Sequence, residues 1–390
     1  DAGLQVRIDD FGNVYGRREG KLKDAEPVVI GSHLDTQPSG GRYDGVIGVL
    51  SALEVIRCLN DRNISTDYPI EIVNFTGQEG ARFRPPMLGS AGIAGAFTKE
   101  YIYSRKDAAG IAFKDALQQI GYMGDEQNRL KQAKNYIELH IEQGSILDRE
   151  NISIGIVEGI QGMSWLRVKV IGEANHAGPT KMEDRNDALI PVAKMILKVR
   201  ELTDEIEELT TTIGKMDVKP NISNIIPGEV EFSIDVRHSN NTIRFHAIES
   251  LKEQLSAIAF IHDVQMTIST TWSSDAIEFS NDIREHINEA AKKFGYSRRS
   301  LYSGPGHDAT YMSQIANTGM IFVKSVNGMS HNEQEYTPDE DIVKGANTLL
   351  YVALKLANEG EINQKEDQEA LNTREIFLTS CKKQNERFIP

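Results

Sequence analysis

Short apolar segments that run into polar, ligand-type residues recur along the chain, and they constrain its fold most strongly. A segment at 27–33 ends in Gly-Ser-His33, a second at 70–75 runs into Thr-Gly-Gln-Glu79, and a third at 136–141 runs into Glu-Gln-Gly. Short, continuously apolar runs between turn residues are typical of strands that are buried on both faces of a sheet. Because polar residues then collect in loops at the strand ends, the pattern also predicts where a site would form.

Segments with helical periodicity alternate with these strands. Apolar residues recur at helical spacing from 45 to 59, and a further strand at 320–325 is followed by a helical stretch from 339 to 358. Strands that alternate with helices predict an α/β fold in which a mixed sheet is flanked by helices.

The middle of the chain has a different order of predicted strands and helices. Strand-like alternation and helical periodicity follow one another there in the order strand 165–172, helix 187–203, strands 211–217 and 230–237, helix 242–260 and strand 264–270. This order is the ferredoxin-like pattern. We therefore expect an α+β domain at 160–273, inserted into a catalytic domain made of 1–159 and 274–358, with a charged tail at 359–390.

The composition narrows the class of protein. The chain has 43 Lys+Arg against 57 Asp+Glu, a net charge of −14, which argues against nucleic-acid binding because neutralising phosphates needs a basic face. No segment approaches the ~18 consecutive apolar residues of a membrane span, and residues 1–10 lack the features of a signal peptide. We expect a cytoplasmic protein without nucleic-acid or membrane partners, although the first residue, Asp1, leaves an upstream targeting segment open.

Three histidines and two carboxylates lie in or just after the predicted strands or before the first helix. They are His33, Asp44, Glu79, His140 and His331. Because the chain has only two cysteines, a metal ion would be held by residues of these types. A carboxylate that bridges two metal ions, with two further ligands on each ion, needs five such residues.

Some of these residues have a simpler interpretation when taken alone. Asp44 stands just before the predicted helix, where it could be an N-cap. In His33-x-Asp35 both side chains face the same side of a strand end, so Asp35 could hold the second ring nitrogen of a metal-binding His33, or the pair could stabilise a turn. The convergence of five residues on the strand ends favours metal binding.

Motifs along residues 1–357 add a resemblance to a known family. They are His33-x-Asp35, Gly-Gly-x-x-Asp44-Gly, Glu79-Gly-x-Arg82-Phe83, His140-Ile-Glu-Gln-Gly, Asn175-His176-Ala-Gly, Asn224-x-Ile-Pro-Gly, Asp235-x-Arg237, Gly304-x-Gly306-His307-Asp308 and Ser330-His331. In this fixed order they resemble the dinuclear-metal amidohydrolases related to the aminoacylase and carboxypeptidase G metallopeptidases. The chain looks most like the carbamoylase branch, which includes N-carbamoyl-L-amino-acid hydrolases, β-ureidopropionase and allantoate amidohydrolase.

The resemblance implies a zinc-exopeptidase-like catalytic domain with two divalent metal ions per subunit. Asp44 would be the bridging carboxylate, with His33 and His140 completing one metal site and Glu79 and His331 the other. Zinc or manganese is expected, with cobalt or nickel as alternatives that the same ligands suit.

The resemblance also implies a homodimer and a set of substrate-binding residues. The inserted domain would act as a lid and a dimerisation domain, and its His176 would polarise the substrate carbonyl in the partner subunit. Asn224 and Arg237 would bind the carboxylate of a small substrate, and Gln143 and the Gly306-His307 loop would line the pocket. Without the family match, His176 could equally well be a surface loop residue without a function. Arg237 could equally well form an ion pair at an interface. We expect open and closed forms of the lid.

Position 78 departs from the family pattern, which has there a glutamate that acts as the general base. A glutamine can orient a water molecule, but its amide cannot accept a proton at pH 7. Such acid–base catalysis is worth about 10²- to 10⁴-fold in rate. Three explanations of Gln78 compete. It is an introduced or isolated Glu→Gln substitution, or the protein is a natural binding relative that has lost activity, or another group relays the proton. We favour the first, because a decaying site would be expected to lose metal ligands as well.

The resemblance thus implies a metal-dependent hydrolase that cleaves the ureido or amide bond of a small carboxylate-bearing substrate. An N-carbamoyl-L-amino acid, which would give the amino acid, ammonia and carbon dioxide, is the first candidate. Allantoate and other N-acyl amino acids are the alternatives within this class. From another class, a non-catalytic metal-dependent binding protein is an alternative because of Gln78.

Overall fold

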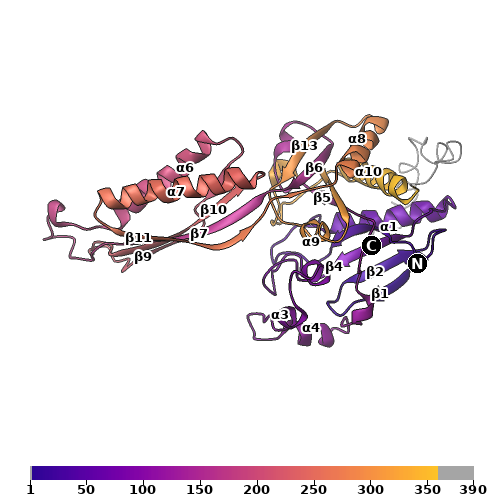
Figure 1. The fold of residues 1–390 in the computed structure, drawn as a ribbon, viewed down its shortest axis with the longest axis horizontal. Helices are drawn as coiled ribbons and strands as arrows, with labels where there is room; N and C mark the ends of the chain where they lie inside the picture. Colours follow the sequence, from indigo (N-terminus) through magenta and orange to yellow (C-terminus); the bar gives the residue numbers. More distant parts are fainter. Residues whose placement is uncertain (1, 359–390) are drawn as a thin grey trace. The chain divides into compact units, whose positions relative to one another are not determined.

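The computed structural model describes residues 2–358, and the charged tail predicted at 359–390 lies outside them. The chain divides into two compact units (Figure 1). One contains the residues up to Glu158 and from Glu278 onward, and the other is Gly159–Ile277. Among the described residues, no helix combines the length and the apolar character needed to cross a bilayer.

The larger unit, here the catalytic unit, is built on a mixed sheet of nine strands. The strands are β1 (Gln5–Ile8), β2 (Val14–Arg18), β3 (Val28–His33), β4 (Ile70–Phe75), β5 (Asn135–Ile141), β6 (Ile154–Ile160), β12 (Ile277–Glu278), β13 (Arg298–Ser303) and β14 (Asn317–Val323). Their order is β1-β2-β4-β3-β5-β14-β6-β12, with β13 paired to β6. The central strands β4, β3, β5 and β14 run parallel, while β2 and β6 are antiparallel to their neighbours, as expected for the predicted mixed sheet.

The parallel centre of this sheet positions the candidate ligands. All residues of β3 and β5 are buried, in agreement with the apolar runs that predicted these strands. His33 is the last residue of β3, and His140 is the last but one of β5. Because parallel strands end at the same edge of a sheet, both histidines and the loop after β4 are brought to one edge.

Helices surround this sheet. They are α1 (Val46–Asp61), α2 (Leu88–Ile93), α3 (Lys99–Tyr103), α4 (Phe113–Gln119), α5 (Ile146–Arg149), α8 (Asn281–Phe294), α9 (Ala309–Met312) and α10 (Asp339–Ala357), with 3-10 turns η1 (Glu126–Asn128) and η3 (Val326–Gly328). The predicted helices at 45–59 and 339–358 are confirmed as α1 and α10. The strand predicted at 320–325 starts and ends earlier, as β14, because Ser325 already begins the turn that contains η3.

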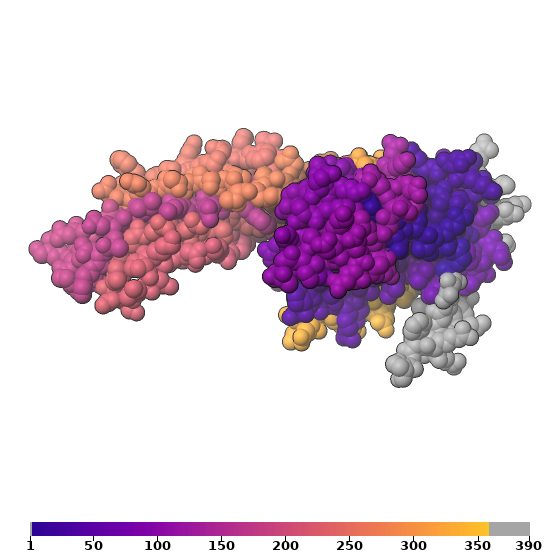
Figure 2. Space-filling view, turned by 90° about the horizontal axis from the view of Figure 1, so that it is seen from below, coloured from indigo at the N-terminus to yellow at the C-terminus, as the bar shows by residue number. Residues whose placement is uncertain are grey.

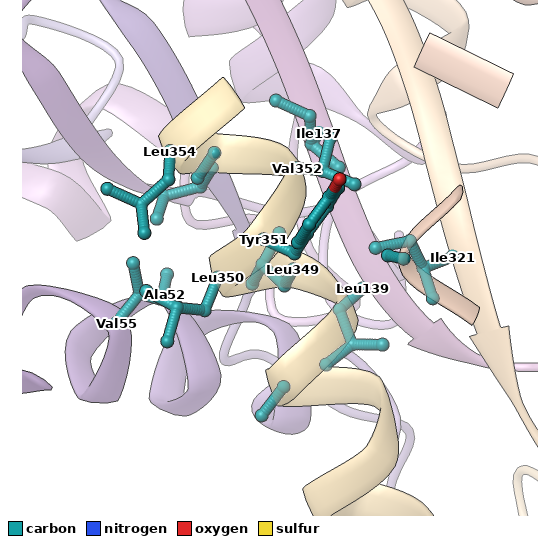
Figure 3. Packing of buried hydrophobic residues seen from close by; sticks show 14 of the residues in the cluster. Ala52, Val55, Ile137, Leu139, Ile321, Leu349, Leu350, Tyr351, Val352 and Leu354 are labelled. Carbon is teal, nitrogen blue, oxygen red and sulfur yellow. The ribbon is translucent and has the colours of Figure 1, made fainter. Parts of the chain in front are cut away.

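The main core lies where α10 packs between α1 and the sheet. Figure 3 shows Leu349 of α10 between Ala52 and Val55 of α1 on one side and Leu139 of β5 and Ile321 of β14 on the sheet side. These side chains are fully buried. The packing of α10 across β5 and β14 thus supports the strand that carries His140.

Truncation of Leu349 to alanine is expected to lower the free energy of unfolding by about 2–5 kcal/mol, because it leaves a cavity in this core. Leu50 lies on the exposed side of α1, so the Leu50→Ala variant is the matched control and should change stability by less than about 0.5 kcal/mol. Urea unfolding followed by circular dichroism measures both variants. Equal effects of the two substitutions would contradict this description of the core.

The smaller unit, here the inserted unit, is an antiparallel sheet with two helices on one face. Its strands are β7 (Gly162–Ile171), β8 (Thr210–Thr212), β9 (Met216–Lys219), β10 (Glu229–His238) and β11 (Gln265–Ser274), and its helices are α6 (Leu189–Glu205) and α7 (Asn241–Ile261), with a 3-10 turn η2 (Met182–Asp184). The strand order is β11-β7-β10-β8, and β9 also pairs with β10. The single strand predicted at 211–217 is therefore wrong: it is two short strands, interrupted around Gly214.

Alternate residues of the inserted sheet face opposite sides. Leu166 and Val168 of β7 and Val230 and Phe232 of β10 are buried with α6 and α7 in one hydrophobic core. The residues between them are more exposed and form the face that carries no helix, which we call the open face. Figure 2 looks toward this face, where β11 (orange) lies beside β7 (magenta) and β7 lies beside the β10 region.

Candidate metal centre

The connection between β3 and α1 places Asp44 at the centre of the site. Helix α1 starts after Gly45, and no side chain caps its N-terminus, so the interpretation of Asp44 as an N-cap is wrong. Gly45 has a φ of 69°, and a Cβ atom there would lie 2.4 Å from the His33 ring. Only glycine allows this turn to pass so close to His33, and the turn directs the Asp44 carboxylate toward the strand ends.

A first group of ligand-type atoms consists of His33, His140 and Asp44. The Asp44 Oδ1 atom lies 3.5 Å from His33 Nε2 and 3.1 Å from His140 Nε2, and all three side chains are buried. The Nδ1 atoms of His33 and His140 each lie 2.9 Å from a main-chain carbonyl oxygen, of Asp35 and Ile141 respectively. Because a carbonyl only accepts, each Nδ1 is the donor and each neutral ring leaves its Nε2 lone pair for a cation.

A second group consists of Asp44, Glu79 and His331. Here His331 Nε2 lies 3.1 Å from the other Asp44 oxygen, Oδ2, and 3.3 Å from Glu79 Oε2. Within each group the possible ligand atoms lie within 4.8 Å of one another. Asp44 therefore offers one oxygen to each group, as a bridging carboxylate would.

Unsatisfied polar atoms in these groups fit the binding of cations. His33 Nε2 and Glu79 Oε1 are buried and have no hydrogen-bond partner. Buried acceptors are rarely left unpaired in proteins unless an ion or a water molecule satisfies them. Imidazole and carboxylate ligands suit zinc, manganese, cobalt and nickel. The residues present thus fit divalent metal ions.

The electrostatics of the groups are those of a cation site. Burial alone would raise the pKa of Asp44, but the imidazoles of His140, His33 and His331 around its carboxylate hold it well below its usual range. Burial would lower the pKa of His33, but Asp44, Asp35 and Asp308 together raise it to about 10. Without a cation these histidines therefore hold protons, and metal binding must displace them, so metal affinity should fall as the pH is lowered.

The Asp35 carboxylate fixes the loop after β4 rather than His33. Its Oδ1 lies 3.7 Å from His33 Nδ1, beyond hydrogen-bond distance, whereas its two oxygens accept hydrogen bonds from the main-chain N–H groups of Gln78 (3.2 Å) and Glu79 (3.0 Å). The second nitrogen of His33 is held by Asp35, as predicted, but the hydrogen bond is accepted by the Asp35 carbonyl oxygen and not by its carboxylate. The carboxylate instead positions Gln78 and Glu79.

Four other predicted residues, Gln143, Gln78, Gly306 and His307, lie next to these groups. Gln143 donates from Nε2 to Asp44 Oδ2 at 2.8 Å, and Gln78 donates from Nε2 to the Gly306 carbonyl oxygen at 3.2 Å. His307 is fully buried, and its ring lies 4.4 Å from that of His140. Burial and the nearby His140 hold the pKa of His307 well below its usual range, so its ring is neutral. His307 thus packs against the His140 ring.

Glu335 belongs to the site, although the sequence patterns did not indicate it. It is buried, and its Oε1 accepts hydrogen bonds from the main-chain N–H groups of Tyr43 (2.9 Å) and Asp44 (3.1 Å). Its Oε2 accepts a hydrogen bond from Ser330 Oγ at 2.8 Å. An acidic residue in a polar loop gives no sign of such burial, so no sequence signal distinguishes Glu335 from the exposed Glu333.

Replacement of Glu335 with alanine is expected to weaken metal binding about 10- to 100-fold, because groups that hold metal ligands in place typically contribute that much. The matched control is Glu333→Ala, in the same loop, which should leave metal binding unchanged. Competition titration with a chromogenic chelator measures the affinity. Equal metal affinities of both variants would show that Glu335 has no part in holding the Asp44 loop.

The remaining predicted residues lie in the inserted unit, at two ends of its sheet. His176 forms a bridge with Ile225, and the main-chain N–H of Ala177 donates to Asn224 O at 2.9 Å. This end of the sheet has a hollow of about 440 Å³ lined by Ala174, Asn175, His176, Pro220, Asn224 and Ile225.

Arg237 stands near the opposite end of β10 from Asn224. It donates to the Asp235 carboxylate, with Nη2 at 2.7 Å from Oδ2. Asn224 precedes the first residue of β10, Glu229, so at about 3.3 Å per residue the two lie roughly 26 Å or more apart. Within one chain they cannot bind one carboxylate together.

Comparisons with known proteins show the family of the chain. The model of the peptidase family M20/M25/M40 matches residues 29–355. The chain belongs to this family. An N-carbamoyl-L-amino-acid amidohydrolase of Rhizobium meliloti is 40% identical over 92% of this chain and 86% of its own length. An allantoate amidohydrolase of Bacillus subtilis is 33% identical over 91% of this chain and 87% of its own length.

Solved structures include close matches to the fold. A hydantoinase/carbamoylase family amidase from Burkholderia multivorans has a TM-score of 0.88 and 43% identity, over 92% of this chain and 88% of its own. With these relatives, the chain is a hydrolase of amide C–N bonds, and the resemblance read from its motifs is confirmed.

Proposed function

We propose that this chain is built to hydrolyse the ureido bond of an N-carbamoyl-L-amino acid, giving the amino acid, ammonia and carbon dioxide. The observation that carries the proposal is the buried Asp44 carboxylate, whose two oxygens face two separate groups of ligand-type atoms. The substrate class is supported by the N-carbamoyl-L-amino-acid amidohydrolase that is 40% identical to this chain.

Two divalent ions complete the proposed site, zinc or manganese first and cobalt or nickel as alternatives. His33, His140 and Asp44 would hold one ion, and Glu79, His331 and Asp44 the other. When bound, such ions acidify a water molecule and polarise the substrate carbonyl. The ligand set itself comes entirely from the catalytic unit.

The side chains around these groups orient the reaction. Gln143 donates to Asp44 and keeps the bridging carboxylate in position. In the proposed mechanism, position 78 is the one from which a proton is taken from water and given to the leaving nitrogen, and the amide of Gln78 can do neither at pH 7. We therefore expect binding to be intact and turnover to be slow in this chain.

The separation of Asn224 from Arg237 supports a site shared by two copies of the chain. We propose that Arg237 binds the substrate carboxylate, because a guanidinium matches its geometry, and that His176 and Asn224 act on substrate bound to a second copy. Exposed apolar residues on α6 and α7 support a homodimer formed through the inserted unit. They are Ile190, Leu197, Phe260 and Ile261.

Mixing two inactive variants tests this sharing, in chains that also carry Gln78→Glu. His176→Ala chains keep their metal ligands, and Asp44→Asn chains keep His176. If the site is shared, mixed dimers regain part of the activity that neither variant has alone. A mixture as inactive as its components, with mixed dimers shown by native mass spectrometry, would contradict the sharing.

Ammonia release tests the proposed substrate. The panel contains N-carbamoyl-L-amino acids, N-carbamoyl-β-alanine, allantoate and N-acetyl amino acids, each with Mn²⁺ or Zn²⁺, and it compares this chain with its Gln78→Glu form. Turnover of N-carbamoyl-L-amino acids by the Gln78→Glu form is the expected result. Turnover of allantoate alone would replace the proposed substrate, as the 33% identical relative would suggest. Binding without turnover in both forms would favour a binding protein.

A further inference from the structure

Two tryptophans stand side by side on the open face of the inserted unit. Trp165 of β7 is 47% exposed and Trp272 of β11 is 42% exposed, and their ring centroids lie 5.0 Å apart at an interplanar angle of 41°. They are the two tryptophans of the chain. Large aromatic rings are costly to leave in water, so such a pair on a sheet face points to a ligand that covers it.

The register of the sheet places this pair next to Arg237. Trp165 pairs with Trp272 on one side and with Asp235 on the other, and Arg237 pairs with Met163. Arg237 and Trp165 are thus diagonal neighbours on one face, about 7–8 Å apart, within reach of long side chains. A molecule whose carboxylate binds Arg237 would therefore extend over the indole rings.

A hollow of about 510 Å³, large enough for an amino-acid derivative, lies beside Trp165 and is also lined by Asp235, Arg167 and Glu231. Trp272 and Arg237 stand next to this hollow and do not line it. The charged groups that line it are paired: Arg167 donates to Glu231 at 2.9 Å, Lys215 lies 2.8 Å from Asp217, and Asp235 accepts from Arg237 at 2.7 Å, so a substrate carboxylate at Arg237 would share that guanidinium with Asp235. A charged side chain would find no unmatched partner among these groups, whereas an apolar side chain would gain contact with the two indole rings.

We propose that Trp165 and Trp272 receive the side chain of the substrate and select N-carbamoyl-L-amino acids with bulky apolar side chains. This inference rests on the proposed function, through the binding of the substrate carboxylate by Arg237. N-carbamoylglycine and N-carbamoyl-β-alanine lack a side chain, and allantoate carries a polar ureido group in its place. All three gain little from the tryptophan pair.

Binding of two ligands that differ only in the side chain tests the inference. The probes are N-carbamoyl-L-leucine and N-carbamoylglycine, measured by calorimetry on the full chain with Mn²⁺. The leucine derivative should bind about tenfold or more tightly, because binding removes the apolar surface of its side chain from water. Since Trp165 and Trp272 give all the tryptophan fluorescence, this ligand should also protect the emission from iodide quenching.

Variants of Trp272 separate this role from a structural one. Trp272→Ala should weaken binding of N-carbamoyl-L-leucine about tenfold and leave N-carbamoylglycine unchanged, while Trp272→Phe should retain most of the leucine affinity. The matched control is Ile171→Ala, at the far end of β7 on the same face, which should change neither affinity.

The outcomes distinguish this inference from the proposed function. Equal affinities for the two ligands, unchanged by Trp272→Ala, would overturn the inference while the proposed function stands. Dissociation of dimers by Trp272→Ala at unchanged leucine affinity would also overturn it, because the pair would then cover a second copy. If neither ligand binds and the Gln78→Glu form releases no ammonia from either, the proposed function itself fails.

Discussion

Replacement of Gln78 with glutamate is expected to raise the rate constant for hydrolysis of an N-carbamoyl-L-amino acid by about 10²- to 10⁴-fold. A carboxylate at this position can take a proton from water and return it to the leaving nitrogen, which an amide cannot do. The measurement is single-turnover ammonia release with metal-loaded protein, so that binding and product release do not mask the chemical step.

The surroundings of Gln78 make the substitution informative. Its Nε2 donates to the Gly306 carbonyl oxygen, a contact that an ionised glutamate loses because a carboxylate has no hydrogen to donate. Its main-chain N–H is still held by Asp35, so the position of residue 78 is kept. Gln78→Ala is the control and should stay slow. If the Gln78→Glu form is folded and metal-loaded but no faster, another group relays the proton.

Replacement of Asp44 with asparagine is expected to abolish binding of both metal ions, whereas His331→Ala should lose only one. Asp44 offers an oxygen to each group and carries the negative charge that three histidines surround. Asparagine has nearly the same shape, so the loss would come from the charge and from the second oxygen. Metal content after dialysis, measured by mass spectrometry, gives the stoichiometry of each variant.

Thermal unfolding of the metal-depleted proteins is the control for Asp44→Asn, since the variant and the parent chain should both remain folded. Retention of one tightly bound ion by Asp44→Asn would contradict the bridging role. Loss of both ions from His331→Ala would instead show that the two groups bind metal only together.

The parallel centre of the sheet was predictable, because β3, β4 and β5 each combine closely spaced apolar residues with a following run of turn and ligand-type residues. The strands β1 and β2 were not predicted, since they are short and carry polar residues at exposed positions. Tertiary pairing with β4 makes them strands, and a local pattern does not report it.

The candidate ligands were also predictable, because five residues of ligand type stand at strand ends. The sequence predicted that Asp35 holds His33 Nδ1, but not through which group. The carbonyl oxygen of Asp35 lies nearer to Nδ1 than its carboxylate does, and only the folded backbone decides this. Glu335 was missed because its function depends on burial between distant segments. The distance between Asn224 and Arg237 could not be predicted, because it depends on where β10 begins and on the rise of about 3.3 Å per residue along the strand.

The central claim is that two metal ions share Asp44, and anomalous X-ray diffraction tests it most directly. Crystals grown with Mn²⁺ or Zn²⁺ would be measured on both sides of the absorption edge of the metal. The account predicts two peaks, one between His33, His140 and Asp44 and the other between Glu79, His331 and Asp44. A single peak, or peaks away from Asp44, would contradict it.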